Sequence, residues 1–462
     1  GPMPTSALPS ATGVRPRPTW RAGALVYTPA GLATLFSWLL WGDFAFQIKE
    51  RILTVAAPLV LRQLQASDFL VGALIGSLPQ ALGMIITPVI AVKSDRHRGR
   101  RGRRIPFLMV PAPIASLALI GMGYTRELGA WLDTLLASQS PGLITCQLLA
   151  FAVCWVVFDI FTVFVNAVFD SLINDVVPSS LIGKFFGLFR AVSLLAGIIF
   201  NFWIIGYVEN HYQTIFLGLS VIYGGGLVLM CLYVREGPLP PPEASAREAR
   251  PGFLKSAKTY VKECFANPYY VWVFLALTFG SLAGGPVNTF SIFYAQSLGI
   301  SMERYGRLLV VTFITSFALS FVLGWLADKF HPLRVGLATL VLYAAVMLWG
   351  AWAATNETVF NIVFIAHGVL MGSYLTGTAS IRQRLFPREK FAQFWSASNI
   401  VVGVGYVVIP PAVGALLDAT GHVYRYTFIG GGIIALIGIA AYAAVYRRFT
   451  ALGGPTAYVP PR

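Results

Sequence analysis

A stripe of polar residues runs along one apolar stretch of the sequence at the spacing of a helix face. It consists of Trp155, Asp159, Thr162, Asn166 and Asp170. Residues three and four positions apart share one side of a helix, so these side chains would face one direction. A charge inside a membrane helix costs about 2.5–3.5 kcal/mol on insertion scales and usually faces a cavity or a partner. We expect Asp159, far from both ends of the stretch, to accept and release a proton.

A second polar stripe lies in the first apolar stretch. Its members are Asp43, Gln47, Glu50 and Thr54. Asp43 and Glu50 are alternatives to Asp159 as the proton-accepting group. Arg51 and Arg190 are candidate charge partners, and by angle Arg51 flanks Glu50 whereas Lys49 points elsewhere. The alternative interpretation is that all these charges only hold helices together as ion pairs.

The later apolar stretches carry neutral polar groups. Hydroxyl, amide and aromatic groups suit a polyhydroxylated ligand, because rings stack on sugar faces and amides bridge hydroxyls. The candidates for a solute cavity are Gln47, Trp155, Thr162 and Asn166 in the first half and Asn288, His367, Tyr374 and Asn399 in the second. The Gly- and Pro-containing stretch 280–289 predicts a helix broken where it lines a cavity. The alternative for each residue, His367 included, is ordinary helix packing.

The elements that position these residues follow from composition. The 462 residues are 56% hydrophobic and 11% charged, against roughly 25% charged in a soluble domain, so the surface faces lipid. A crossing needs about 20 apolar residues. The candidates are 31–61, 69–92, 105–124, 143–172, 184–207, 213–234, 269–297, 305–327, 333–354, 358–381, 392–416 and 424–446.

The longest segment between crossings divides these twelve into two groups of six. We expect a cytoplasmic tail over 1–30, a six-helix half over 31–234, a linker over 235–268, a second half over 269–448 and a tail over 449–462. The linker opens with a Pro-rich run and continues with apolar residues alternating with Lys255, Lys258 and Lys262. That pattern predicts an amphipathic helix at the inner membrane face.

The net charge of +15 has a topological explanation. With both termini cytoplasmic, the inside segments hold 26 of the 34 Lys and Arg residues. This asymmetry follows the positive-inside rule, so the charge does not require a nucleic-acid partner. We expect a multi-pass protein of the plasma (inner) membrane, in contact with the lipid bilayer.

Both halves place an acid and a base at the cytoplasmic end of their second helix. The candidate gate residues are Asp95, Arg96, Arg103 and Arg104 in the first half and Asp328 and Lys329 in the second. A short basic loop there would cap helix ends and latch neighbouring helices, although any inside loop is basic. Asp170 and Asp175, with Lys184 and Arg190, are expected to form a further structural latch.

These residues resemble a known family. Gly324 to Lys329 is similar to the loop motif of the major facilitator superfamily, and Ser94 to Phe107 resembles the signature of the glycoside–pentoside–hexuronide and sucrose transporters. Trp155, Asp159 and the segment 172–175 repeat a layout of that group. The resemblance implies an all-α fold of twelve transmembrane helices in two six-helix halves. Where the group has an Arg implied to bind sugar and couple protons, this chain has Asp170, which argues against sucrose itself.

The resulting expectation is a monomeric secondary transporter that works by alternating access, as a proton-coupled symporter of a sugar or glycoside. The alternatives are a transporter of an amphiphilic or lipid-linked solute and a non-transporting membrane sensor on the same fold. The sequence has no phosphate-binding loop for ATP, no metal-site spacing among its four cysteines, and no pattern that calls for a cofactor. We expect no enzyme activity.

Overall fold

The computed structural model describes residues 18–239, 241 and 253–462, and these form an all-α fold with one small hairpin. The hairpin pairs β1 (Trp20–Ala22) with β2 (Leu25–Tyr27), in a segment predicted to be a tail. Most of the predicted N-terminal tail and part of the Pro-rich linker lie outside the described residues. Thr28 caps the first helix by accepting a hydrogen bond from the backbone N–H of Gly31.

The first half is built of ten α-helices. They are α1 (Pro29–Gln63), α2 (Asp68–Val71), α3 (Leu78–Arg96), α4 (Ile105–Met109), α5 (Pro111–Gly123), α6 (Thr125–Leu136), α7 (Leu143–Val176), α8 (Ile182–Ile199), α9 (Val208–Ser220) and α10 (Gly226–Tyr233). Short π-helical turns continue the helical path over Gly72–Ser77, Phe200–Ile204 and Val221–Gly225. The apolar pattern did not predict α6.

The linker helix and the second half follow. They comprise α11 (Phe253–Phe265), α12 (Pro268–Leu282), α13 (Gly285–Ser297), α14 (Met302–Phe330), α15 (Pro332–Ala353), α16 (Glu357–Gly377), α17 (Ile381–Leu385), α18 (Phe391–Ala419), α19 (Arg425–Ala451) and α20 (Gly454–Ala457). The predicted helix in the linker is α11. The predicted break in the seventh crossing separates α12 from α13.

Ten helical segments among the described residues are long and apolar enough to cross a membrane. One of them, Lys184–Tyr233, has 50 residues, more than twice the roughly 20 that one crossing needs. Its backbone leaves helical geometry at His211, so it makes two crossings. Helix α1 has 35 residues but carries charges near its middle, which lower its hydropathy. With α1 counted and the long segment divided, the described residues contain the twelve predicted crossings.

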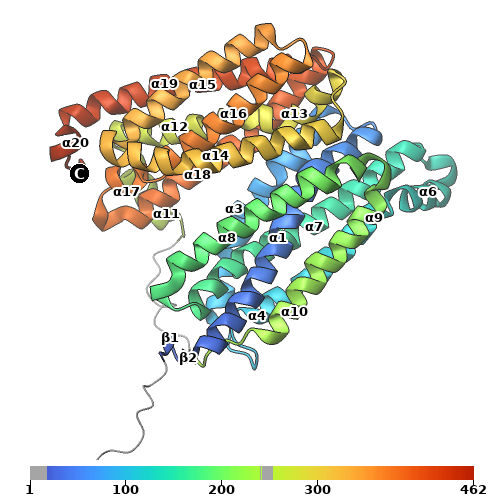
Figure 1. Cartoon of the computed structure of the whole chain (residues 1–462), viewed down its shortest axis with the longest axis horizontal. Coiled ribbons are helices and arrows are strands. Elements are labelled where there is room, and N and C mark those ends of the chain that lie inside the picture. Colours follow the sequence, from blue (N-terminus) through green and yellow to red (C-terminus); the bar gives the residue numbers. More distant parts are fainter. Residues whose placement is uncertain (1–17, 240, 242–252) are drawn as a thin grey trace, which may run out of the picture.

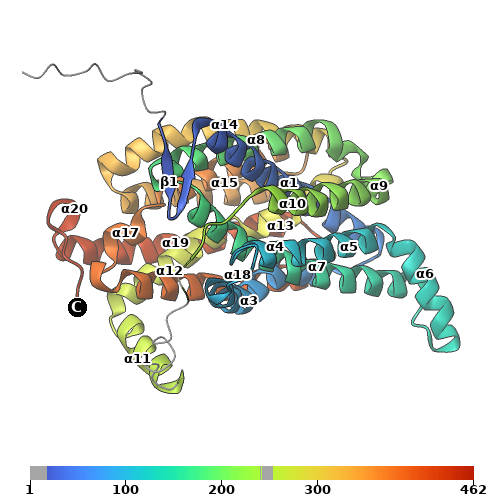
Figure 2. The same ribbon diagram turned by 90° about the horizontal axis from the view of Figure 1, so that it is seen from below.

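The two halves form two helix bundles side by side, joined through the linker (Figure 1). In Figure 2, α11 projects from the bundles at one end and α6 at the opposite end. We call the end with α11, α20 and the 97–104 loop the linker end, and the end with α6 and the α18–α19 turn the far end. Contacts between the halves include α18 against α2 and the π-helical turn 72–77, and α14 against the turn 200–204.

Glycines allow the halves to approach closely toward the far end. A Cβ added at Gly72 would lie 2.4 Å from the carbonyl oxygen of Pro410, and one at Gly306 would lie 2.2 Å from that of Asn201. Both distances are far below van der Waals contact, so a larger residue would push the helices apart. Small residues at these two positions therefore permit the contact between halves.

Candidate functional site

A cluster of polar side chains lies inside the first half, between α1 and α7. The side chains of Asp43 and Asp159 are 3% and 5% exposed. Gln47 donates a hydrogen bond to Asp43 Oδ1 at 3.5 Å and accepts one from Ser193 of α8 at 3.0 Å. The Oδ2 atoms of Asp43 and Asp159 are buried without a hydrogen-bond partner among the described residues. Two helices thus bring two incompletely paired carboxyl groups into the interior.

Lys49 lies in the same cluster, and its predicted direction was wrong. Its side chain is 1% exposed, and Nζ lies 2.5 Å from Glu50 Oε1 and 4.1 Å from the centroid of the Phe46 ring. Adjacent helical residues do not normally face each other, but the four-carbon stem of Lys49 bends back because a buried ammonium group needs a partner. The carboxylate of Glu50 is 49% exposed. The charges of Lys49 and Glu50 also act electrostatically on Asp159.

Of the two predicted charge partners, only Arg51 reaches this cluster. It donates a hydrogen bond to Ser193 Oγ at 3.2 Å, and its guanidinium carbon lies 4.6 Å from the centroid of the Phe313 ring on α14. Arg51 therefore contacts both halves. Arg190 is exposed on α8 and takes part in none of the ion pairs between described residues.

The other residues of the α7 stripe have different surroundings. Thr162 is buried, and Asn166 is half-buried with an unpartnered Oδ1 among the described residues. Asp170 is exposed nearer the linker end. Trp155 donates a hydrogen bond from Nε1 to the carbonyl oxygen of Leu74 at 2.8 Å. Its indole ring is buried in helix packing and does not line an open space.

The second half contains a neutral polar chain at the break between α12 and α13. The hydroxyl of Tyr343 lies 2.7 Å from His367 Nδ1, and His367 Nε2 lies 2.9 Å from Asn288 Oδ1. The break allows Asn288, whose side chain is exposed, to reach the buried His367. Tyr374 instead bonds Tyr442 at 2.6 Å, inside the half. Asn399 is exposed on α18.

At the linker end, the loop between α3 and α4 holds three helices of the first half together. Arg103 makes two hydrogen bonds to Asp175, at 2.8 and 2.7 Å, and this carboxylate raises the pKa of Arg103. Arg104 reaches Asp175 at 3.1 Å and Asp95 at 2.5 Å. Bidentate Arg–carboxylate pairs of this kind fix geometry as well as charge. The prediction that Asp175 pairs with Lys184 or Arg190 was wrong, because the loop arginines reach it first.

Glu236, after α10, completes this arrangement. It accepts hydrogen bonds from the backbone N–H groups of Arg104 and Ile105, the latter at 3.1 Å, and so caps the start of α4. Burial raises the pKa of Glu236 despite these bonds. Gly102 has a φ of +103°, and a Cβ there would lie 2.1 Å from Glu236 Oε2. Only glycine therefore fits the motif at this position.

The corresponding motif of the second half is more open. Asp328 accepts a hydrogen bond from Arg384 at 2.9 Å, although its side chain is 80% exposed. Lys329 lies over the Trp325 ring, 4.9 Å from its centroid. Arg96, the remaining candidate gate residue of the first half, is exposed. The two loops thus share residue types but differ in how strongly they tie helices together.

The family model of the Major Facilitator Superfamily matches residues 39–301 and 281–457. The chain belongs to this family of membrane transporters. The sequence of this major facilitator is 25% identical over 224 residues to that of the riboflavin transporter MCH5 of Saccharomyces cerevisiae. That match covers 47% of this chain and 43% of the yeast protein, so it spans less than half the length of that relative.

Solved structures of other transporters share the fold. A bacterial homologue of the iron transporter ferroportin, in an inward-facing state, has a TM-score of 0.67 at 15% identity, over 90% of this chain and 99% of that one. A bacterial homologue of the human lysosomal transporter Spinster has a TM-score of 0.63 at 15% identity, over 91% of this chain and 97% of that one. A D-xylose–proton symporter has a TM-score of 0.58 at 14% identity, over 90% of this chain and 96% of that one. At these identities the likeness establishes the fold alone.

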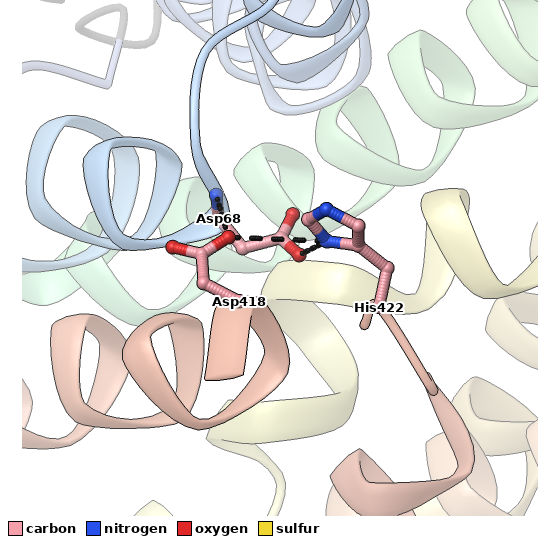
Figure 3. A group of neighbouring side chains, drawn as sticks. All are labelled: Asp68, Asp418 and His422. Atoms are coloured by element: carbon pink, nitrogen blue, oxygen red, sulfur yellow. Dashed lines mark hydrogen bonds and ion pairs between the residues drawn. The ribbon is translucent and has the colours of Figure 1, made fainter. Parts of the chain in front are cut away.

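The far end of this major facilitator carries a polar cluster that sequence reasoning missed (Figure 3). Asp418, near the end of α18, accepts hydrogen bonds from the backbone N–H groups of Asp68 and Phe69, both at 2.9 Å. These are the first residues of α2, so a carboxylate from the second half caps a helix of the first. His422 Nδ1 lies 2.5 Å from Asp68 Oδ2. We call Arg62, Asp68, Asp418, His422 and Tyr424 the far-end latch.

The centre of the latch is Asp68, whose side chain is fully buried. Its carboxylate accepts hydrogen bonds from Arg62 and from the hydroxyl of Tyr424, both at 3.3 Å, and Arg62 also bonds Tyr424. Ligand atoms of Asp68, Asp418 and His422 lie within 4.8 Å of one another, a spacing that can hold a metal ion. Here the carboxylates already accept hydrogen bonds from backbone N–H groups, a guanidinium group and a hydroxyl group. The arrangement is therefore that of a hydrogen-bonded contact between halves.

Proposed function

We propose that this major facilitator is a proton-coupled symporter of a sugar or glycoside, with Asp159 as the group that accepts the proton. It works as a monomer in the plasma (inner) membrane, with its linker end in the cytoplasm. The observation that carries the proposal is the buried, incompletely paired carboxyl of Asp159 near the midpoint of α7. Such a group is costly to keep charged in a membrane protein, which favours a role in proton transfer.

The neighbourhood of Asp159 supports coupling to solute binding. Lys49 and Glu50 form an ion pair that acts on Asp159, and Glu50 is half exposed. A solute hydroxyl that binds Glu50 would weaken its hold on Lys49 and so change the field at Asp159. Asp43 is the second candidate for the same role, because its Oδ2 is also buried without a partner among the described residues.

The arrangement of the halves supports alternating access. Among the described residues, the side-chain hydrogen bonds and ion pairs that join the two halves lie toward the far end, in the far-end latch, between Gln296 and Glu209, and between Ser77 and the carbonyl of Val407. The bundles converge there and diverge toward the linker end (Figure 1). With the linker end cytoplasmic, this corresponds to an inward-facing state.

The solute class rests on the neutral polar chain of the second half. Asn288 offers an exposed amide whose oxygen is held by His367, and Asn399 offers another. Amides of this kind suit hydroxyl groups of a sugar, and one structural neighbour is a D-xylose–proton symporter. A second candidate is a larger amphiphilic solute, which the sequence match to a riboflavin transporter favours.

The test is uptake into proteoliposomes. Labelled pentoses, hexoses, glycosides and riboflavin are offered with and without an inward proton gradient, to the wild type, to Asp159→Asn and to Asp133→Asn, a far-end acid on α6 outside the cluster. Gradient-stimulated uptake of one sugar, lost in Asp159→Asn and retained in Asp133→Asn, is expected. Uptake of riboflavin and of no sugar would make riboflavin, in place of a sugar, the proposed solute. Uptake that Asp159→Asn leaves gradient-stimulated would remove Asp159 from coupling, and no uptake of any solute would favour a sensor.

A further inference from the structure

A large cavity opens at the linker end of the second half, away from the polar cluster and the far-end latch. Its volume is about 1600 Å³, above the roughly 300–1,000 Å³ of a typical small-molecule site. It is lined by α11, the turn that joins α17 to α18, and the C-terminal residues that follow α19. Figure 2 shows α11, α17 and the C-terminus at the same end of the molecule. None of the predicted solute or proton sites lines it.

The cavity is lined by an excess of positive charge from three separate segments. The basic residues are Lys255, Lys258 and Lys262 from α11, Arg384 from α17, Arg388 and Lys390 from the turn after it, and Arg462. Arg384 is already paired with Asp328, at 2.9 Å. The acidic side chains are Glu263 and Glu389. Of these, Glu263 is already occupied, because it accepts a hydrogen bond from Gln393 at 2.7 Å and lies 3.8 Å from Lys390.

The lysines of α11 are placed by helix geometry. Positions 255, 258 and 262 are three and four residues apart, so they share one face of the helix, and that face lines the cavity. The positive-inside rule explains why basic residues gather at this end of the protein. It does not explain why basic residues from three segments converge on one cavity, where like charges repel.

The cavity walls are fixed by specific contacts. Tyr270 donates a hydrogen bond to the carbonyl oxygen of Pro461, and Tyr458 donates one to that of Leu385, both at 2.6 Å. The Tyr458 ring also lies 5.0 Å from that of Phe449. These contacts hold the C-terminal segment against the second half. The site is therefore preformed, which lowers the entropy cost of binding a ligand.

We propose that this cavity binds a phosphate-bearing anion. Ammonium and guanidinium groups converging from three sides are the donors that phosphate oxygens accept, and a concave basic surface concentrates anions. The cavity is large enough for a phosphate ester with its attached group. The same chemistry is offered by an anionic phospholipid headgroup, which an amphipathic basic helix at the membrane surface would meet, and by a soluble phosphomonoester. This site is independent of the proposed transport function.

The test compares the two sources on the full-length purified protein. One arm measures retention of phosphatidylglycerol against phosphatidylcholine by native mass spectrometry, and the other measures binding of glycerol 3-phosphate by calorimetry. The variant Lys255→Ala/Lys258→Ala/Lys262→Ala removes one wall, and Arg388→Ala removes part of another. The matched control, Lys93→Ala/Arg100→Ala/Arg101→Ala, removes three exposed basic residues at the same end of the first half.

We expect the α11 variant to lose roughly 100-fold in affinity, since each lysine near an anionic surface contributes about a fivefold factor, while the control retains wild-type binding. Arg388→Ala should show a smaller loss, which separates loss of charge from misfolding of α11. Preference for phosphatidylglycerol identifies a lipid headgroup, and binding of glycerol 3-phosphate identifies a soluble ligand. Binding of neither, or equal losses in the α11 variant and the control, overturns the proposal.

Discussion

Replacing Asp418 with alanine should release the far end of the protein. The carboxylate accepts two backbone hydrogen bonds at the start of α2, both at 2.9 Å, and is 28% exposed. Hydrogen bonds to a charged group contribute about 1.5–3 kcal/mol each. Because Asp418 is partly exposed, each of its hydrogen bonds contributes a free energy at the lower end of this range, and water takes the place of each bond when the halves separate. We therefore expect the closed far end to lose about 2–3 kcal/mol, which shifts the equilibrium roughly 30- to 150-fold toward opening.

The measurement is the rate at which a thiol reagent labels Val71→Cys. Val71 is 1% exposed behind the latch, so its labelling rate reports the population with an open far end. The four native cysteines, all free, are first replaced by serine. Asp418→Ala should raise the rate by about 30-fold or more until the open state saturates. Asp133→Ala, which removes a far-end carboxylate that does not join the halves, should leave it unchanged. Equal rates in the two variants would refute the latch.

Three further changes test other contacts. Glu50→Gln leaves Lys49 buried without its anion and should cost about 1–3 kcal/mol after allowance for the exposure of Glu50, seen as a lower melting temperature that Lys49→Met restores in the double variant. Gly102→Ala should cost about 2 kcal/mol, because φ is positive and Cβ meets Glu236; Glu236→Ala should recover only part of that loss. Burial, then nearby arginines, lowers the pKa of His331 to about 4, so its stabilising effect is complete above its unfolded pKa and is lost as pH falls toward 4. Between pH 7.5 and 4 the difference in unfolding free energy between the wild type and His331→Asn should therefore narrow by about 1–2 kcal/mol. Melting temperatures measured across this pH range report the difference, and a constant gap would contradict the prediction.

The fold could be predicted because its signals are local. Apolar length fixes each crossing, and breakers such as the glycines near residue 284 fix where a helix stops. Basic loops predict one orientation for all the crossings together. The helix α6 was missed because it is amphipathic and lies outside the apolar stretches, where hydropathy carries no signal.

The contacts between segments could not be predicted in the same way. Helical spacing identified Asp43 and Asp159 as inward-facing, but it assigned Lys49 the wrong direction because a long side chain can reach away from its own face. Asp68 and Asp418 are 350 positions apart. Each lies beside a loop, where a charged residue is ordinary, so no periodicity connects them. Only the packing of the two halves brings them together.

In the proposed mechanism, α1 is the element that connects the proton site to the far-end latch. It carries Glu50, next to the lysine that acts on Asp159, and twelve residues further along the same helix it carries Arg62, which binds Asp68. Twelve residues of helix span about 18 Å, and Pro58 lies among them, where it removes one backbone hydrogen bond and favours a bend. A change of charge near Asp159 that tilts or rotates α1 would displace Arg62 to the extent that the helix does not bend at Pro58. The Lys49–Glu50 pair, Asp159 and α1 all belong to the first half, so this mechanism places the driving charge and the moving helix there, while the second half holds the latch through Asp418 and His422.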